Sequence, residues 1–132
     1  MIDTSVVVAG LMSPWGPAGT LVRAMYGDML RWAVDGRILR EYGEVSARPK
    51  FKLAPNEPYF LMLKLRSSAL WILPIPCSLK LPDKSDRPFI EVALALPQPI
   101  IVTRNLRHFV PAAKLGVEIL TPEQAIPGLL AP

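Results

Sequence analysis

Acidic side chains occur in three separate parts of the chain, each beside the predicted end of a strand or the predicted start or body of a helix. Asp3 follows two apolar residues, Glu41 lies within a predicted helix, and Asp86 opens another helix with Asp83 three residues before it. If the fold gathers these acids, they repel one another unless a cation neutralises them. Hard oxygen ligands of this kind suit Mg²⁺ or Mn²⁺. A bound ion of this type polarises a phosphoryl oxygen and activates water, which is the chemistry of phosphodiester hydrolysis.

Helix capping is the alternative interpretation for the aspartates. A carboxylate at a helix N-terminus accepts hydrogen bonds from free backbone N–H groups and is favoured by the helix dipole. For Asp3 alone the two interpretations carry about equal weight. For Asp83 and Asp86 both can hold, because a cap fixes the backbone and leaves the second carboxylate oxygen free to face a metal.

Two glutamates share the helix that Asp35 is predicted to cap, and helical geometry separates them. At about 100° per residue, Glu41 lies about 60° from Ile38 and Glu44 about 120° from it. Glu41 therefore borders the apolar stripe and is the candidate ligand, whereas Glu44 points toward water. The stripe consists of Ile38, Leu39, Tyr42 and Val45.

Helices and strands that would position these acids alternate along the chain. Apolar spacing and proline positions predict helices over residues 17–29, 35–48, 58–70 and 86–96, and a capping-box pattern predicts a helix after Thr121. Short strands are predicted over residues 30–34, 71–73, 100–103 and 117–120. Alternation of this kind predicts an α/β fold with a mostly parallel sheet covered on both faces. Functional sites in such sheets lie beyond the carboxyl ends of the strands, where residues 3–5, 83–86 and 103–105 are polar.

The length and composition predict one domain, residues 1–132, in the cytoplasm and outside the membrane. The longest apolar runs are far shorter than the ~18–20 residues that cross a bilayer. Asp3 stands where a signal peptide would carry a basic residue, and the single Cys77 cannot form an internal disulfide. A net charge of +4 is compatible with a polyanionic partner such as nucleic acid, and by itself it is weak support.

Basic residues near the predicted site are candidates for phosphate contacts. Arg104 follows a predicted strand and is the favoured nucleic-acid contact, with Arg107 as a second candidate. A structural role is favoured over general-acid catalysis for His108, the only histidine. Solvated loop charges are at least as good an interpretation for a second basic group, Arg48, Lys50 and Lys52.

The three tryptophans, Trp15, Trp32 and Trp71, are predicted to be core or interface residues. No run of basic residues interleaves them, as a platform for stacked bases would require.

Taken together, these segments resemble the PIN-domain family, in particular VapC-like toxin components of bacterial toxin–antitoxin systems. Several motifs in the right order cover nearly the whole chain, which makes the resemblance more specific than any one motif. The matching segments are 2–11, 34–42, 45–51, Asp83 and Asp86 with Pro88, Phe89 and Ala93, and 102–109.

The resemblance implies a single PIN-like domain, a three-layer α/β/α sandwich around a mostly parallel sheet, with Mg²⁺- or Mn²⁺-dependent nuclease activity. Carried over by motif, Asp3, Glu41 and Asp86 resemble the core acids of the family, with Asp83 a less certain neighbour. Thr103 resembles the hydroxyl residue of the fourth motif. Reaction products with 5′-phosphate and 3′-hydroxyl ends are implied as well.

Two departures from the family pattern affect this interpretation. Asn105 stands where many members carry a further aspartate, so a second metal would be held weakly or not at all. Only two residues precede Asp3, where the family has several strand residues. The first, central strand is therefore expected to be very short, or the start of the chain misses residues, and the stability is expected to be reduced.

Two functions follow from the sequence. The leading hypothesis is a toxin-type, metal-dependent ribonuclease with an RNA substrate and a cognate antitoxin protein. The alternative is a catalytically weakened PIN-like module that binds nucleic acid or an antitoxin. The apolar surface of the 58–70 helix favours a homodimer or higher homo-oligomer.

Overall fold

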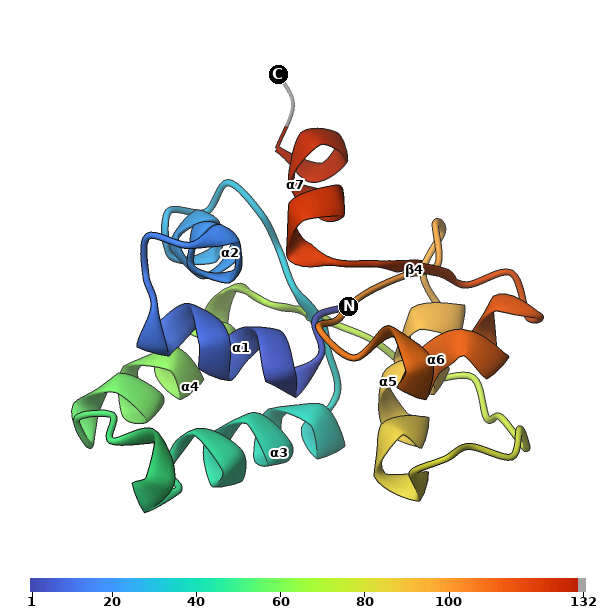
Figure 1. The fold of residues 1–132 in the computed structure, drawn as a ribbon, viewed down its shortest axis with the longest axis horizontal. Helices are drawn as coiled ribbons and strands as arrows, with labels where there is room; N and C mark the ends of the chain where they lie inside the picture. The colour runs from blue at the N-terminus through green and yellow to red at the C-terminus, as the bar shows by residue number, and fades with distance from the viewer. Residues whose placement is uncertain (131–132) are drawn as a thin grey trace.

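Helices dominate the computed structural model, which describes residues 1–130 of the chain (Figure 1). The α-helices are α1 (Thr4–Met12), α2 (Pro17–Tyr26), α3 (Gly36–Ser46), α4 (Asn56–Ser68), α5 (Arg87–Leu94), α6 (Leu106–Ala113) and α7 (Pro122–Leu129). The strands are β1 (Ala33–Val34), β2 (Leu70–Trp71), β3 (Ile100–Val102) and β4 (Glu118–Leu120), and short 3₁₀ turns span Pro49–Phe51 and Lys84–Asp86. Residues 131 and 132 of the predicted domain lie outside the described part.

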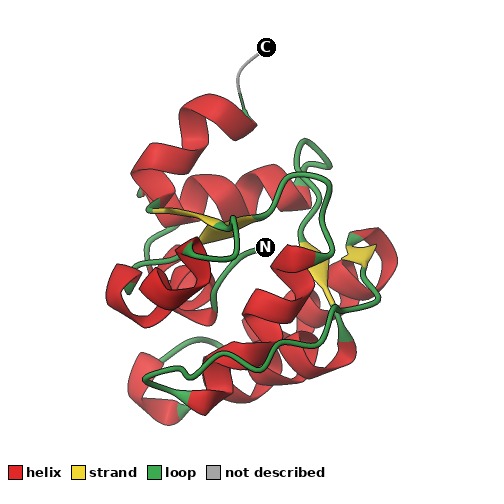
Figure 2. Cartoon of the chain, turned by 90° about the vertical axis from the view of Figure 1, so that its right-hand side faces the viewer, coloured by secondary structure: helices red, strands yellow, loops and turns green. Residues whose placement is uncertain are grey.

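All four strands pair in parallel, which confirms the predicted strand direction. β1 pairs with β2, and β3 pairs with β4, as two separate two-stranded sheets (Figure 2). Ile2 adds a single parallel bridge to Val102. A continuous sheet does not form among the described residues. The α/β class therefore holds, and the three-layer sandwich stays a prediction.

Five predicted helices are present as α2, α3, α4, α5 and α7, and two helices were not predicted. In α1 apolar residues lie on every face, so the sequence of this helix has no amphipathic period. α6 follows Asn105 in a segment for which no element is predicted, and it contains Pro111. No single helix in residues 1–130 has the length and apolarity to cross a bilayer; α1 and α2 meet those criteria only as a pair bent by 92°.

A line of buried aromatic rings runs through the core. The ring centroids of Trp32 and Tyr42 lie 6.1 Å apart, and those of Tyr42 and Phe89 lie 6.4 Å apart. The Tyr42 hydroxyl donates a hydrogen bond to the carbonyl of Ile2, which ties α3 to the N-terminal segment. Trp32 is therefore a core residue as predicted.

The other two tryptophans are not core residues. Trp15 is 84% exposed and Trp71 is 50% exposed, so neither belongs to the core, and an interface role stays a prediction for both. Trp15 lies in the turn between α1 and α2, and Trp71 lies in β2.

Replacing Tyr42 by Phe tests the link between α3 and the N-terminal segment. The Tyr42→Phe variant leaves the Ile2 carbonyl without its donor in a buried position, which costs about 1–3 kcal/mol of unfolding free energy. Urea denaturation measures this loss. Tyr59→Phe is the matched control, because the Tyr59 side chain is exposed and the change should stay within about 0.5 kcal/mol. Equal stabilities of the two variants would contradict the prediction.

Candidate functional site

The four predicted acids line one open cavity of about 520 Å³. Asp3 comes from the segment before α1, Glu41 from α3, Asp83 from the loop before α5, and Asp86 from the start of α5. α1 packs along α3, and α5 contacts α3, so three helices bring the acids to the same place (Figure 1). Asp3 and Asp86 are buried, whereas Asp83 is exposed.

Helix capping does not account for the carboxylates of Asp3 and Asp86. Both residues hold the N-cap position of a helix, yet neither side chain accepts a hydrogen bond from the backbone of that helix. Asp35 differs, because its carboxylate accepts from the Ile38 N–H, as predicted for a cap. Asp83 also acts as a cap, accepting from the Ser85 N–H at 2.9 Å. The buried carboxylates at positions 3 and 86 are therefore free for another role.

Asp3 is held by two hydroxyl groups. The hydroxyls of Ser5 and Thr103 donate to its Oδ2 at 2.7 and 2.8 Å, and the Asn105 N–H donates to the Thr103 hydroxyl at 2.9 Å. These bonds tie the loop after β3 to the start of α1. No residue within 1–130 donates to Oδ1 of Asp3, which leaves that oxygen available to a ligand.

Glu41 faces the cavity, and Glu44 on the same helix is exposed, as predicted from the helical geometry. The Thr4 hydroxyl donates to Oε2 of Glu41. Burial raises the pKa of Glu41, and repulsion from Asp3 and Asp83 adds to that effect, while the Thr4 hydrogen bond and the charge of Arg48 oppose it. Sequence analysis does not predict the hydrogen bond between Thr4 and Glu41, because it joins residues 37 positions apart.

Asp86 has the largest carboxylate pKa shift in the cavity. Burial, with repulsion from Asp3 and Asp83, raises its pKa from 3.8 to about 6. His108 partly offsets the shift, because its Nδ1 lies 3.2 Å from Oδ2 of Asp86. This contact places His108 in the site, where sequence analysis favoured a structural role, and it depends on the unpredicted helix α6.

The acidic cavity has the ligand chemistry of a divalent cation site without a preformed cage. Among residues 1–130, no three His, Cys, Asp or Glu side chains already converge closely enough to hold an ion. The cavity nevertheless offers four carboxylates, two of them buried, and burial together with mutual repulsion raises the pKa values of Glu41 and Asp86. Hard oxygen donors in such surroundings fit Mg²⁺ or Mn²⁺, and an ion would relieve the repulsion.

Two arginines line the cavity beside the acids. Arg104, the favoured phosphate contact, does so, and Arg48 does so as well. Arg107 is exposed and does not line the cavity. Sequence analysis did not favour a phosphate contact for Arg48 over a solvated loop charge. The position of Arg48 directly after α3, the helix that carries Glu41, is the signal that could have identified it.

Residues that sequence analysis did not consider anchor the segment leading to Asp83. Glu91 accepts a hydrogen bond from the Cys77 N–H at 2.7 Å and one from Nη1 of Arg37 at 2.7 Å. Arg87 donates to the carbonyls of Cys77 and Leu79. An acid and a base one helical turn apart on α5 therefore fix the loop that ends at Asp83.

Comparison with known proteins identifies the family. A family model described as "PIN domain" matches residues 1–107, which include Asp3, Glu41, Asp83, Asp86 and residues 103–105. No curated protein and no solved structure matches the chain. The chain therefore belongs to the PIN-domain family, whose members are generally nucleases that depend on divalent metals.

The raised pKa of Asp86 predicts how stability depends on pH in the absence of metal. Below about pH 4 this carboxyl is protonated in both folded and unfolded chains, so Asp86 does not lower the unfolding free energy there. As the pH rises from about 4 to about 6 the unfolded chain ionises first, and the unfolding free energy falls. Urea denaturation in EDTA should show a smaller fall for Asp86→Asn than for the wild type. Glu44→Gln is the control, and an unchanged slope in Asp86→Asn would contradict the prediction.

Proposed function

We propose that this PIN-domain chain is a divalent-metal-dependent endoribonuclease of the toxin type. The observation that carries the proposal is the single cavity that Asp3, Glu41 and Asp86 line from three elements far apart in sequence. Neither buried aspartate is used as a cap, and the arginines in the wall suit a polyanionic substrate. The family supports nuclease chemistry, and RNA as the substrate is part of the proposal.

Asp3, Glu41 and Asp86 are the residues that would hold Mg²⁺ or Mn²⁺, with Asp83 and Asn105 at the edge of the site. When bound, the ion supplies Lewis-acid activation of the phosphodiester and of water. Asn105 can contribute its amide oxygen, with no charge.

The surrounding residues of the chain have supporting roles in this proposal. Thr103 and Ser5 fix the orientation of Asp3 through their hydroxyls, and Thr4 does the same for Glu41. Arg104 lies beside Asp3 and binds the phosphate of the bound strand. Cleavage leaves 5′-phosphate and 3′-hydroxyl ends.

An RNA cleavage assay with Mn²⁺ or Mg²⁺ tests the proposed function. Loss of a group that only orients a metal ligand costs about 10–100-fold in activity. We therefore expect Thr103→Val to lose activity in that range, and Asp3→Asn, Asp86→Asn and Glu41→Gln to lose about 100-fold or more. The matched control is Glu44→Gln, which changes an exposed acid on the same helix as Glu41 and should cleave like the wild type. Activity that survives Asp3→Asn, Asp86→Asn and chelation would eliminate the mechanism.

The second candidate function is a nucleic-acid-binding or antitoxin-binding module with weakened catalysis. The observation that favours it is the lack of a preformed three-residue metal cage among residues 1–130, together with Asn105 in the cavity wall. This candidate predicts salt-sensitive RNA binding without metal-dependent turnover. Calorimetric titration with Mn²⁺ distinguishes the two, because only the nuclease requires an ion at Asp3, Glu41 and Asp86.

As part of the proposal, the protein acts in the cytoplasm with a cognate antitoxin and forms a homodimer or higher homo-oligomer through α4. The outer face of α4 exposes three apolar side chains, Tyr59, Phe60 and Leu63. A patch of this kind on a helix favours association.

Replacing Phe60 by Lys tests the role of α4 in association. The charge would have to be buried in the interface, so the Phe60→Lys variant should have the mass of a monomer in light scattering at concentrations where the wild type is larger. Leu73→Lys, which changes a residue that is 89% exposed outside α4, is the control. A wild-type mass equal to one chain would contradict the homo-oligomer.

A further inference from the structure

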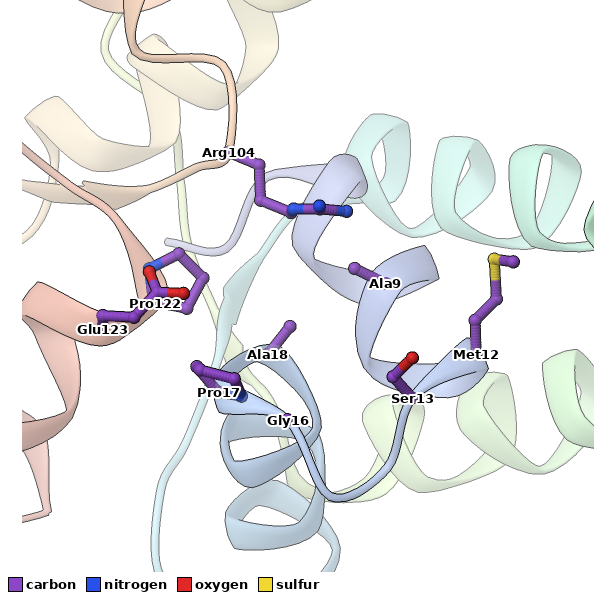
Figure 3. Close-up of a pocket in the computed structure, with 9 residues that line it drawn as sticks. All are labelled: Ala9, Met12, Ser13, Gly16, Pro17, Ala18, Arg104, Pro122 and Glu123. Atoms are coloured by element: carbon purple, nitrogen blue, oxygen red, sulfur yellow. The ribbon is translucent and has the colours of Figure 1, made fainter.

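A second cavity, of about 250 Å³, lies between α1, the start of α2 and the start of α7 (Figure 3). Ala9, Met12 and Arg104 line both this cavity and the acidic cavity, so the two are neighbours with a shared wall that includes Arg104. A chain bound at the acids therefore reaches the second cavity by passing these three residues.

The walls of the second cavity are mostly apolar. They include Met12, Pro17, Ala18 and Pro122, and Figure 3 shows the Pro122 ring near Pro17 and Ala18. Its volume is below the roughly 300–1,000 Å³ of pockets for drug-sized ligands, so it suits a single ring system. Glu123 in the wall disfavours a phosphate there, whereas an uncharged nucleobase carries no such penalty.

The turn that forms one wall of this cavity also presents Trp15 to solvent. Ser13 and Gly16 line the cavity on either side of it, and Trp15 is 84% exposed. The Arg23 guanidinium lies 4.7 Å from the centroid of the Trp15 ring, and Nε of Arg23 donates to the carbonyl of Pro14 at 2.9 Å. An exposed aromatic ring beside an arginine is the arrangement that stacks nucleic-acid bases, contrary to the expectation from sequence.

Arg104 lines both the acidic cavity and the second cavity. Within residues 1–130 its guanidinium has no acidic partner within 4.0 Å, while its backbone N–H is held by the Ser5 hydroxyl at 3.3 Å. The positive charge is therefore available to a phosphate between the two cavities.

We infer that the second cavity is a base-binding subsite for single-stranded RNA. In this arrangement a phosphate lies at Arg104, the adjacent base enters the cavity, and the next base stacks on Trp15. A base that is paired in a duplex cannot enter, so the substrate is unpaired next to the cleaved bond. The inference rests on the proposed function for its choice of RNA, and it adds the strand path and the requirement for an unpaired base.

Binding of a fluorescent single-stranded oligoribonucleotide, measured by anisotropy in EDTA, tests the subsite without depending on cleavage. Trp15→Ala removes the stacking surface, and Gly16→Leu fills the cavity. Gly16 tolerates a side chain locally, because an added Cβ meets no atom closer than 3.6 Å. We expect each variant to bind at least about fivefold more weakly, as the loss of one stacked base implies.

Two matched controls accompany these variants. Trp71→Ala removes the other exposed tryptophan, and Gly128→Leu adds the same side chain where an added Cβ meets nothing within 4 Å. Both controls should bind like the wild type, and melting temperatures establish that all four variants fold. Variants at positions 15 and 16 that fold and bind like their controls would overturn the subsite.

A series of oligonucleotides with one abasic position each supplies an independent arm. The wild type should lose affinity at two adjacent positions, and Gly16→Leu should lose no further affinity at the position whose base enters the cavity. A uniform response along the series would overturn the inference. Positional binding without cleavage in Mn²⁺ overturns the nuclease alone. Cleavage without positional dependence overturns the subsite alone, and the absence of both RNA binding in EDTA and cleavage in Mn²⁺ overturns both.

Discussion

The attachment of residues 1–3 to β3 is the interaction on which the site depends. The Asp3 N–H donates to the Val102 carbonyl, and the Val102 N–H donates to the Met1 carbonyl, both at 2.9 Å. The Thr103 hydroxyl, directly after β3, then reaches the Asp3 carboxylate. This short ladder and the hydroxyl bonds to its residues place Asp3 among acids from α3 and α5. A segment with so few backbone bonds needs the additional hydrogen bond from Tyr42, which explains why a buried tyrosine hydroxyl points at a strand carbonyl.

Among the described residues, the acids of the cavity lack the arginine partner that the other buried acids, Asp35 and Glu91, have. Arg37 pairs with both Asp35 and Glu91, at 2.8 and 2.7 Å, and these three residues stabilise the loop and helix around the site. Within residues 1–130, the cavity acids have no Lys or Arg within 4.0 Å, and only Asp86 has a histidine. Keeping carboxylates close together and unpaired destabilises the fold, a cost that proteins typically bear at functional sites. This difference in pairing is stronger evidence for a functional site at the cavity than the burial of its acids.

The sequence predicted those features that depend on neighbours along the chain. The Asp35 cap, the capping box at Thr121 and the choice of Glu41 over Glu44 follow from spacing within one helix. It did not predict α1, whose residues are apolar on every face, or the division into two sheets. Contacts such as Thr4 with Glu41 escape prediction because they exist only once α1 packs on α3.

Asn105 affects the charge of the site without affecting its architecture. Its contribution to the loop is made by its backbone N–H, which bonds the Thr103 hydroxyl, and any residue other than proline supplies that group. The hydroxyl of Thr103 therefore remains directed at Asp3 whether position 105 is acidic or neutral. A neutral amide lowers the repulsion within the metal-free cavity and also lowers its attraction for a second cation. In the proposed nuclease, a neutral residue at position 105 therefore favours one bound ion over two and leaves Arg104 without a competing acid at the next position.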